Sequence, residues 1–494
     1  MRQIDMQFPA CFRKRRVKTR DRLTRRDLPL SLMDDSGSVV PQGNTELKRS
    51  SLGRFRFTLQ GYNQKAVQHQ DSEENGPGRG TAPMLNSELI ANLQASALAA
   101  LLESSHTPHK LAAYHGALTP QELDAPQVEI EALAHGAALH DLGWLRRVDV
   151  RGADRFRWLS GMVTNTVNDL FPNTGAWNLV LDAQGHIQGD LTVWRGGEEQ
   201  SPQRRSPANP QKGRNGATKN EEDPLLGTPF AGESGLELEI AADQREKLLA
   251  HLNKFIVMDD VELVPVSEEK VGEAGSETCV GLTGTLAPEV LERVGLPALV
   301  TPMTQSTVEW NGWDVRILRG YGTLAPHYEF WLPSAGLAKL WSCLRTGGAT
   351  PVGCAAVEAF RVAEGIPVYG IDIVERDLPQ ETAQMRALHF SKGCYLGQEI
   401  VERIRSRGNV HRHLRPLELA GPVPARGAEL MLEDGTVAGA ITSAAELPLQ
   451  SGTRVFALGM IRAEAEASNQ ALRYKAGDDA GTAGILAAPP RLAM

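Results

Sequence analysis

One cysteine lies in a segment whose neighbours could make its thiol reactive. Cys394 stands in "SKGCYLGQEIVERIRSRG", with Lys392 two positions before it and with Gly393 and Gly397 permitting close approach or a positive φ. A thiol reacts as the thiolate, and its pKa falls near cations and at helix N-termini. Residues 398–405 carry apolar side chains at helical spacing, so we expect a helix that begins just after the cysteine. The alternative is packing, because free cysteines usually fill small spaces in a core.

Three charged side chains stand where a strand or a helix would hold them in place. Asp190 ends the stretch "GHIQGD", just before an apolar strand. Glu329 lies in "HYEFWL", where alternation puts its carboxylate on the face opposite the tyrosine, phenylalanine and leucine. Arg361 lies in the apparent helix "EAFRVAEGIPVYG". The alternatives are a solvated carboxylate in the first two cases and, for Arg361, an ion pair with Glu358 or Glu364 of the same helix.

The composition is that of a globular protein of two or three domains. The chain has 494 residues, of which 41% are hydrophobic and 23% charged. No apolar run reaches the roughly 18 residues of a membrane-spanning helix, and the start lacks the apolar core of a secretory signal. The five cysteines form no CxxC pair and no zinc-like spacing. We therefore expect free thiols in a reducing compartment, the cytoplasm, and no metal centre.

Charge is distributed unevenly between a basic N-terminal segment and an acidic body. Residues 11–26 contain nine basic residues and one acid, so the rest of the chain carries −16 within an overall net charge of −8. Residues 1–85 contain too little apolar surface to offset the entropy of folding, which predicts a disordered basic tail, or an extension before a true start at Met84. A nucleic-acid-binding arm or a targeting peptide is the alternative. The acidic body is a poor match for direct binding to nucleic acid.

The segments after this tail predict helices and strands that share one core. "NSELIANLQASALAALLES" predicts a first helix with Asn86 or Ser87 as its cap. Residues 196–235 are rich in Pro, Gly, Ser and charge, which predicts a disordered surface insertion. "LELEIAADQREKLLAHL" from Leu236 and "YEFWLPSAGLAKLWSCL" from Tyr328 each read as a strand and an amphipathic helix, at a constant offset of 92 residues.

This internal repeat predicts an α+β fold in which two related β-α-β-type units form one core over residues 86–390. Residues 391–411 would form a connection that holds the cysteine motif and its helix. Short alternating runs separated by Gly, Pro and "EDG" turns then predict a C-terminal β-barrel over 412–474. The last segment, 475–494, reads as another tail.

The cysteine segment resembles a known signature. "KGCYLGQE" is similar to the motif of the YgfZ-type folate-binding proteins, which belong to the superfamily of the glycine-cleavage aminomethyltransferase (T-protein). Apart from the insertion, the resemblance extends from about His135 to Glu464, through "LHDLGWLRRVDVRGADRFRWLSGMVTNTVNDL", "GAWNLVLDAQGHIQGDLTVWR" and "GTVAGAITSAA". The aminomethyltransferases themselves lack the cysteine motif, so the resemblance implies the YgfZ-type branch.

The resemblance implies a folate-binding core in which the two units surround a central cavity for tetrahydrofolate or a one-carbon derivative. Asp190 would lie beside the reactive nitrogens of the pterin and stabilise a cationic adduct. Glu329 would accept two adjacent N–H groups of the ring, and Arg361 would lie near the ring system. The chain departs from the family at Gly189, a position that is often acidic, and this departure bears on the transferase activity.

The same resemblance places Cys394 on the connection, facing the cavity or its rim, and gives it a catalytic role beside Asp190. Lys392 and Tyr395 of the motif would help to bind the cofactor. The implied role is the assembly or maintenance of iron–sulfur clusters in client enzymes, including tRNA-modifying ones, with client or assembly proteins as partners. Whether the chain is an enzyme stays open. The alternatives are a tetrahydrofolate-dependent aminomethyl transferase that uses Asp190, and an RNA-binding partner that acts through the basic tail.

Overall fold

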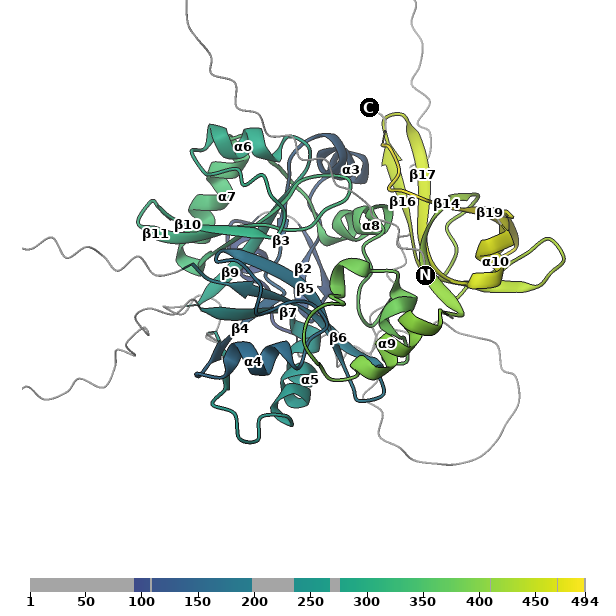
Figure 1. The fold of residues 1–494 in the computed structure, drawn as a ribbon. Helices are drawn as coiled ribbons and strands as arrows, with labels where there is room; N and C mark the ends of the chain where they lie inside the picture. The colour runs from purple at the N-terminus through teal and green to yellow at the C-terminus, as the bar shows by residue number, and fades with distance from the viewer. Residues whose placement is uncertain are drawn as a thin grey trace, which may run out of the picture. The chain divides into compact units, whose positions relative to one another are not determined.

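The described part of the chain is an α+β core followed by a closed β-barrel, as the sequence predicts (Figure 1). In this computed structural model the described residues are 93–106, 109–197, 235–266, 276–408, 410–468 and 470–492. The tail expected at 1–85 lies outside them, as does all of the expected insertion except its edges at 196, 197 and 235. Within the described ranges, no helix is long and apolar enough to cross a membrane.

A sheet of 11 strands forms the centre of the described core, in the order β13-β3-β9-β12-β11-β10-β5-β6-β7-β4-β8. Its strands are β3 (Ala138–Asp141), β4 (Leu145–Arg151), β5 (Thr174–Leu181), β6 (Ile187–Arg195), β7 (Leu236–Ala241), β8 (Glu262–Pro265), β9 (Glu277–Thr283), β10 (Thr304–Trp310), β11 (Trp313–Arg319), β12 (His327–Pro333) and β13 (Thr350–Pro351). A separate hairpin consists of β1 (Lys110–Tyr114) and β2 (Ala117–Glu122).

Helices flank this sheet and connect it to the barrel. The α-helices are α2 (Ala97–Ser104), α3 (Pro126–His135), α4 (Arg155–Ser160), α5 (Ala242–Asn253), α6 (Ala287–Arg293), α7 (Leu337–Thr346), α8 (Cys354–Glu364), α9 (Gln398–Arg407) and α10 (Ala463–Ser468). Short 3-10 turns are η1 (Ser334–Gly336), η2 (Pro379–Thr382) and η3 (Met385–Ala387).

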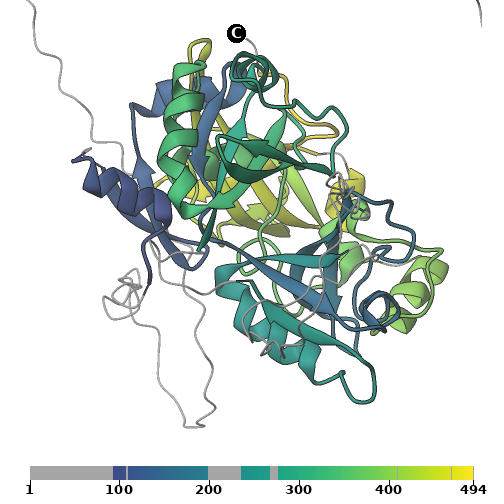
Figure 2. The same cartoon turned by 90° about the vertical axis from the view of Figure 1, so that its left-hand side faces the viewer.

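The two halves of the sheet repeat one arrangement, as the internal repeat predicts. Along the chain the order β4-α4-β5-β6-β7-α5-β8 is followed by β9-α6-β10-β11-β12-α7-β13. In the sheet the first half runs β5-β6-β7-β4-β8, and the second runs β10-β11-β12-β9, then the inserted β3, then β13. The halves meet where Thr304 of β10 pairs with Thr174 of β5. Both views accordingly show α5 and α7 at opposite ends of the sheet (Figures 1 and 2).

The sheet is curled, because side chains far apart in its strand order touch. Arg147 on β4 donates to Glu277 Oε2 on β9 at 2.7 Å, although six strands lie between them in the sheet. In a flat sheet these two strands would be about 30 Å apart, since neighbouring strands are spaced by about 4.8 Å. Strand twist accumulates into such curvature. The inner faces of the two halves therefore face each other.

The outer faces of the two halves are covered by helices, and this fixes which side chains point inward. Tyr328, Phe330 and Leu332 of β12 pack in the cluster that contains α7, while Trp331 belongs to a separate inner cluster. The face predicted for Glu329 is thereby confirmed, since alternate residues of a strand point to opposite sides.

The first described helix begins later than the sequence predicts. Residues 93–96 are not helical, and Ala95 forms a β-bridge with Leu118. Ser96 caps α2, with its Oγ accepting a hydrogen bond from the backbone N–H of Ala99 at 3.0 Å. The expected caps at Asn86 and Ser87 lie outside the described residues. The apolar periodicity gave no sign of this bridge, which is a tertiary contact.

Strands β6 and β7 flank the expected insertion and are direct neighbours in the sheet. Arg195 pairs with Leu236, and one step further the N–H of Gly196 donates to the carbonyl of Gly235 at 2.8 Å. The ladder is therefore continuous up to the edges of the insertion.

The barrel extends beyond the boundary predicted at residue 474, so the expected tail over 475–494 is wrong. The barrel order is β14-β17-β16-β15-β18-β19, made of β14 (Arg412–Ala420), β15 (Glu429–Met431), β16 (Val437–Leu449), β17 (Gly452–Arg462), β18 (Leu472–Ala476) and β19 (Asp479–Ile485). Closure depends on β19, where Leu417 pairs with Ile485. The small residues of "DAGTAGI" gave no alternating apolar pattern, and backbone pairing holds them in the sheet.

The predicted helix after the cysteine is α9, and the turn before it docks on the β5–β6 hairpin. Gly397 caps the helix with φ +79, and a Cβ there would lie 2.5 Å from the carbonyl oxygen of Asp182. Gly393, in contrast, has open space around it and no positive φ. Of the two motif glycines, only Gly397 is required by the backbone.

We expect Gly397→Ala to lower the free energy of unfolding by about 1–3 kcal/mol, the cost of a left-handed conformation in a non-glycine residue. The matched control is Gly393→Ala, which adds a methyl group to open space and should change stability by less than about 0.5 kcal/mol. Urea denaturation of both variants measures the difference. Equal effects at the two positions would contradict this account of the turn.

Candidate functional site

One cavity lies inside the curled sheet, beneath α8. It has a volume of about 280 Å³, close to the lower end of the roughly 300–1,000 Å³ of ligand pockets. Its wall includes aromatic residues from the β1–β2 hairpin, from both halves of the core, from α8 and from the segment after it, namely Tyr114, Trp144, Trp177, Tyr321, Phe360 and Tyr369. Asp190, Glu329 and Arg361 all line this cavity. The structure thus brings together three residues that are far apart in the sequence.

Asp190, on β6, is held at the cavity wall by two hydrogen bonds. Trp177 Nε1 donates to its Oδ2 and Gln244 Nε2 donates to its Oδ1, each at 2.9 Å. Burial raises the pKa of Asp190, while these bonds and the nearby Arg386 oppose the rise. Each carboxylate oxygen has two lone pairs, so one on each oxygen stays available to a ligand.

Packing against α5 explains why residue 189 is a glycine. A Cβ at that position would lie 2.7 Å from Leu248 Cδ2 and 2.9 Å from Gln244 Oε1, both on α5. The glutamine that orients Asp190 therefore occupies the space that an acidic side chain at residue 189 would need.

Glu329, on β12, lies beside a second carboxyl that the sequence analysis did not single out. Glu239 on β7 also lines the cavity. Its side chain is 8% exposed, and that of Glu329 is 7% exposed. Burial and then the Glu329 carboxylate hold the pKa of Glu239 well above its ordinary value. Glu239 therefore holds a proton more readily than an ordinary glutamate does.

Two neutral histidines continue from Glu329 along the same wall. His327 Nε2 lies 3.5 Å from Glu329 Oε1, and Thr283 Oγ1 bridges His327 Nδ1 at 2.8 Å and His140 Nε2 at 2.9 Å. Burial lowers the pKa of His140 to about 3 and that of His327 to about 4. Neither ring carries charge near neutral pH.

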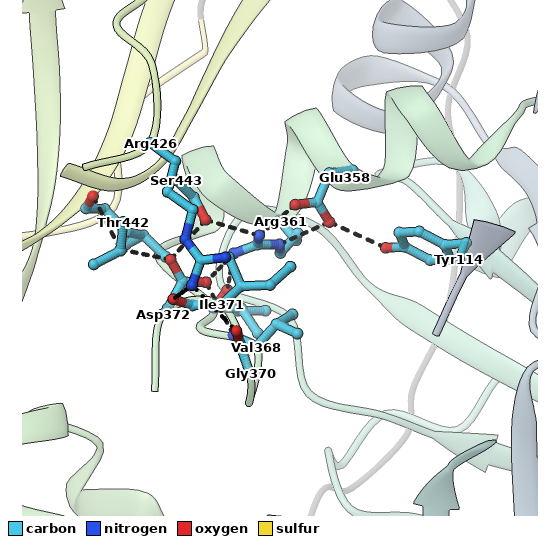
Figure 3. A network of polar contacts seen from close by, with 12 residues as sticks. Tyr114, Glu358, Arg361, Val368, Gly370, Ile371, Asp372, Arg426, Thr442 and Ser443 are labelled. Carbon is cyan, nitrogen blue, oxygen red and sulfur yellow. Dashed lines mark hydrogen bonds and ion pairs between the residues drawn. The ribbon is translucent and has the colours of Figure 1, made fainter. Parts of the chain in front are cut away.

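Arg361 is fully engaged by the protein, and Figure 3 shows it at the centre of a polar network. Its Nε and Nη2 donate to the two oxygens of Glu358, Nη1 donates to Asp372 Oδ2 at 2.6 Å and to the carbonyl of Ile366 at 3.2 Å, and Nη2 also donates to Ser443 Oγ at 3.0 Å. A guanidinium has five N–H groups, and all five are used.

This network supports the alternative given for Arg361 in the sequence analysis. With every N–H engaged, the side chain has no donor left for a ligand, so the ion pair with Glu358 is the alternative that the structure supports. Burial lowers the pKa of Arg361, but Asp372 and Glu358 outweigh it and raise the value overall. Asp372 also accepts from Thr442 and Ser443 on β16. Arg361 thus joins the cavity wall to the barrel.

Arg386, in η3, is a cation at the cavity that keeps unused N–H donors. The sequence did not indicate it. Its guanidinium carbon lies 4.1 Å from the centre of the Trp177 ring and 4.0 Å from that of Tyr321. Among the described residues only its Nε–H donates, to Gln384 Oε1 at 3.2 Å. Burial lowers the pKa of Arg386 to about 10, so it stays charged at neutral pH.

The cysteine motif lies next to the cavity wall rather than in it. Cys394 is exposed, and neither it nor Lys392 or Tyr395 lines the cavity. Lys392 Nζ donates to the carbonyls of Val163 and Asn165, each at 2.6 Å, and burial lowers its pKa to about 7. The amide of Asn165 in turn donates to the carbonyls of Trp177 and Arg386. One residue therefore separates the motif from the wall.

Glu239 and Arg386 differ in how clearly the sequence indicates the direction of their side chains. In "LELEIA" the two glutamates alternate with apolar residues, as Glu329 does in its strand, so the same argument could have found Glu239. Arg386 lies in an irregular segment after η2, where no periodicity indicates the direction of a side chain.

Comparison with known proteins finds relatives in sequence and in fold. No family model matches the chain. An aminomethyltransferase of Nostoc sp. is 24% identical over 340 residues, which cover 68% of this chain and 80% of that protein. One of Rubrobacter xylanophilus is 26% identical over 343 residues, covering 69% and 80%. The crystal structure of glycine cleavage system aminomethyltransferase T from Bartonella henselae matches with a TM-score of 0.64, at 19% identity, over 81% of this chain and 98% of that one.

The described chain is therefore a protein with the aminomethyltransferase fold. The sequence relatives and the shared fold together place it in the superfamily of the glycine-cleavage aminomethyltransferase (T-protein).

We expect Arg361→Gln to lower the free energy of unfolding by about 3–5 kcal/mol, because it leaves the buried carboxylate of Asp372 without its cation. The control is Arg405→Gln on α9, whose exposed pair with Glu402 spans 3.4 Å and contributes less than about 0.5 kcal/mol. Thermal and urea unfolding of both variants tests this difference. A small effect at Arg361 would show that the network does not hold the barrel and the core together.

Proposed function

We propose that this protein binds a reduced folate, tetrahydrofolate or a one-carbon derivative, in the cavity described above. The observation that carries the proposal is the presence of two carboxylates, Asp190 and Glu329, in one aromatic-walled cavity. The similarity to aminomethyltransferases, a folate-dependent class, supports the same ligand.

The two carboxylates suit different parts of a pterin. Glu329 would accept adjacent N–H groups of the ring, since a carboxylate accepts such a pair in bidentate fashion. Asp190 would lie near the reactive nitrogens, where its charge would stabilise a cationic one-carbon adduct. The rings of Trp177 and Tyr321 offer flat surfaces for stacking. Arg361 would act indirectly, through the position of α8, and Arg386 would supply the charged donor.

For the cell, we propose the role of the YgfZ-type branch, in which a cytoplasmic folate-binding protein supports iron–sulfur clusters in client enzymes, including tRNA-modifying ones. The "KGCYLGQE" motif supports this assignment. Cys394 has an exposed thiol that a partner protein can reach, and Lys392, whose pKa burial lowers to about 7, stands two residues away. Lys392 and Tyr395 would hold the motif in place, because neither lines the cavity.

The second candidate is one-carbon transfer by the enzyme itself, and the hydrogen-bonded Asp190 favours it. Its carboxylate is oriented from two sides, by Trp177 and Gln244, as a group in a reaction centre must be. This candidate needs Asp190 and is indifferent to the exposed cysteine.

Titration of the purified protein with tetrahydrofolate should show saturable binding, and Glu329→Ala should weaken it about 30-fold or more, the cost of removing a buried charged partner. Glu309→Ala, which removes an exposed glutamate on β10, is the control and should bind as the unmodified protein does. Calorimetry measures both. No saturable binding to the unmodified protein would refute the proposed ligand.

Cys394→Ala and Asp190→Asn separate the two cellular roles. In a knockout strain assayed for iron–sulfur enzyme activity, support of client enzymes predicts that Cys394→Ala fails to complement, because it removes the exposed thiol. One-carbon transfer predicts instead that Asp190→Asn abolishes folate-dependent turnover of an aminomethyl or N-methyl donor, while Cys394→Ala leaves it intact. Full complementation by Cys394→Ala would exclude the first role.

A further inference from the structure

Arg386 has unused hydrogen-bond donors at the cavity, and the proposed function names no ligand atom for them. Arg361 and Arg386 are the arginines of the described residues that line the cavity. Arg361 uses all five N–H groups within the protein, whereas Arg386 donates to the described residues only through Nε, to Gln384. The two Nη groups of Arg386 therefore keep their N–H donors for a ligand.

Contacts to both halves of the core hold this guanidinium in place. Its carbon lies 4.1 Å from the centre of the Trp177 ring on β5 and 4.0 Å from that of Tyr321, in the loop between β11 and β12. The amide of Asn165 donates to the carbonyls of Arg386 and Trp177, at 2.7 and 3.1 Å, which ties the main chain to the same strand. Aromatic rings engage the faces of a guanidinium and leave its N–H edge available. The donors are therefore positioned before a ligand arrives.

Trp177 also brings Arg386 close to Asp190. Its Nε1 donates to Asp190 Oδ2 at 2.9 Å, while the guanidinium lies over the face of the ring. The two charges are near enough to interact, because Arg386 opposes the rise that burial causes in the pKa of Asp190. Each oxygen of Asp190 keeps one lone pair beyond the bonds from Trp177 and Gln244. This part of the wall thus combines an acceptor with a charged donor.

A formyl group on tetrahydrofolate matches this combination. When one of the two reactive nitrogens carries the formyl group, the other keeps its N–H, so the ligand presents a carbonyl oxygen near an N–H donor. Asp190 would accept from the N–H, and Arg386 would donate to the oxygen. A methyl group in place of the formyl group offers no acceptor, and the guanidinium would lose water without gaining a partner.

We propose that Arg386 is a specificity-determining residue that donates to the oxygen of a formyl group, so that the cavity selects formyl-bearing over methyl-bearing tetrahydrofolates. This inference rests on the proposed function, which leaves the one-carbon derivative open, and it names the class of that derivative. Glu329 would hold the pterin ring in both compounds, so the ring does not decide the preference. The selection depends on one ligand oxygen and one guanidinium.

The test compares 5-formyl- and 5-methyltetrahydrofolate, with tetrahydrofolate as the reference, on the full chain and on Arg386→Met. Methionine is unbranched and uncharged, so it fills space between the two rings and removes the donors. We expect the unmodified protein to prefer the formyl compound by about tenfold or more, the value of one hydrogen bond to a charged group, and Arg386→Met to lose that preference. Arg403→Met, at an exposed position on α9, is the control and should keep it. Calorimetry measures the affinities, and melting curves check that both variants fold.

The outcomes separate this inference from the proposed function. The same preference in Arg386→Met as in the unmodified protein would overturn the inference, and so would the absence of a preference in the unmodified protein. If tetrahydrofolate binds in either case, the proposed ligand stands and only the role of Arg386 fails. If none of the three folates binds the unmodified protein, both fail.

Infrared spectroscopy tests the same contact without depending on a variant. A carbonyl stretches at a lower frequency when it accepts a stronger hydrogen bond, and a bond from a guanidinium is stronger than one from water. With a carbon-13 label in the formyl group, the carbonyl band of the ligand should move below its frequency in water when it binds the unmodified protein. A band that stays in place or moves to higher frequency would contradict donation by Arg386.

Discussion

The curl of the central sheet is the constraint on which the site depends. Residues that would be tens of ångströms apart in a flat sheet meet because the inner faces of two similar halves turn toward each other. The ion pairs of Arg147 with Glu277 and of Arg316 with Glu237 join these faces directly. Asp190 and Glu239 come from the first half and Glu329 from the second, so neither half contains the site alone.

A second constraint is electrostatic, and it explains why a buried arginine at the cavity has all of its N–H groups bound to the protein. Arg361 is desolvated next to the cavity and must be compensated inside the protein. Its partners come from α8 itself, from the loop after it, and from β16 of the barrel. These partners take up every N–H donor of Arg361, so its guanidinium joins α8, the loop after it and the barrel at one point. Arg386 is only half-buried, and aromatic rings flank it instead, so it keeps donors that face the cavity.

The sequence predicted the features that local periodicity determines. It did not predict the features that depend on contacts between distant parts of the chain. The repeat, the α+β core, the barrel and the inward face of Glu329 follow from periodicity, and the structure confirms them. The role of Arg361 could not be predicted, because Asp372 and Ser443 are distant in sequence and only the fold reveals them. Arg386 lies in an irregular segment, and β19 consists of small residues, so neither produces an apolar pattern. Glu239 alternates with apolar residues in its strand, so its inward direction is readable from the sequence.

The ladder between β6 and β7 has a consequence for how this chain can vary. Because Gly196 and Gly235 are hydrogen-bonded across the ladder, the departing and returning strands are already in register before the extra segment starts. Closing a longer loop costs only a slowly growing entropy, so the sheet places little restriction on the length inserted there. Sequence added or deleted at this point leaves β6 and β7, which carry Asp190 and Glu239, where they are, so this end of the ladder tolerates changes in the length of the chain that joins them.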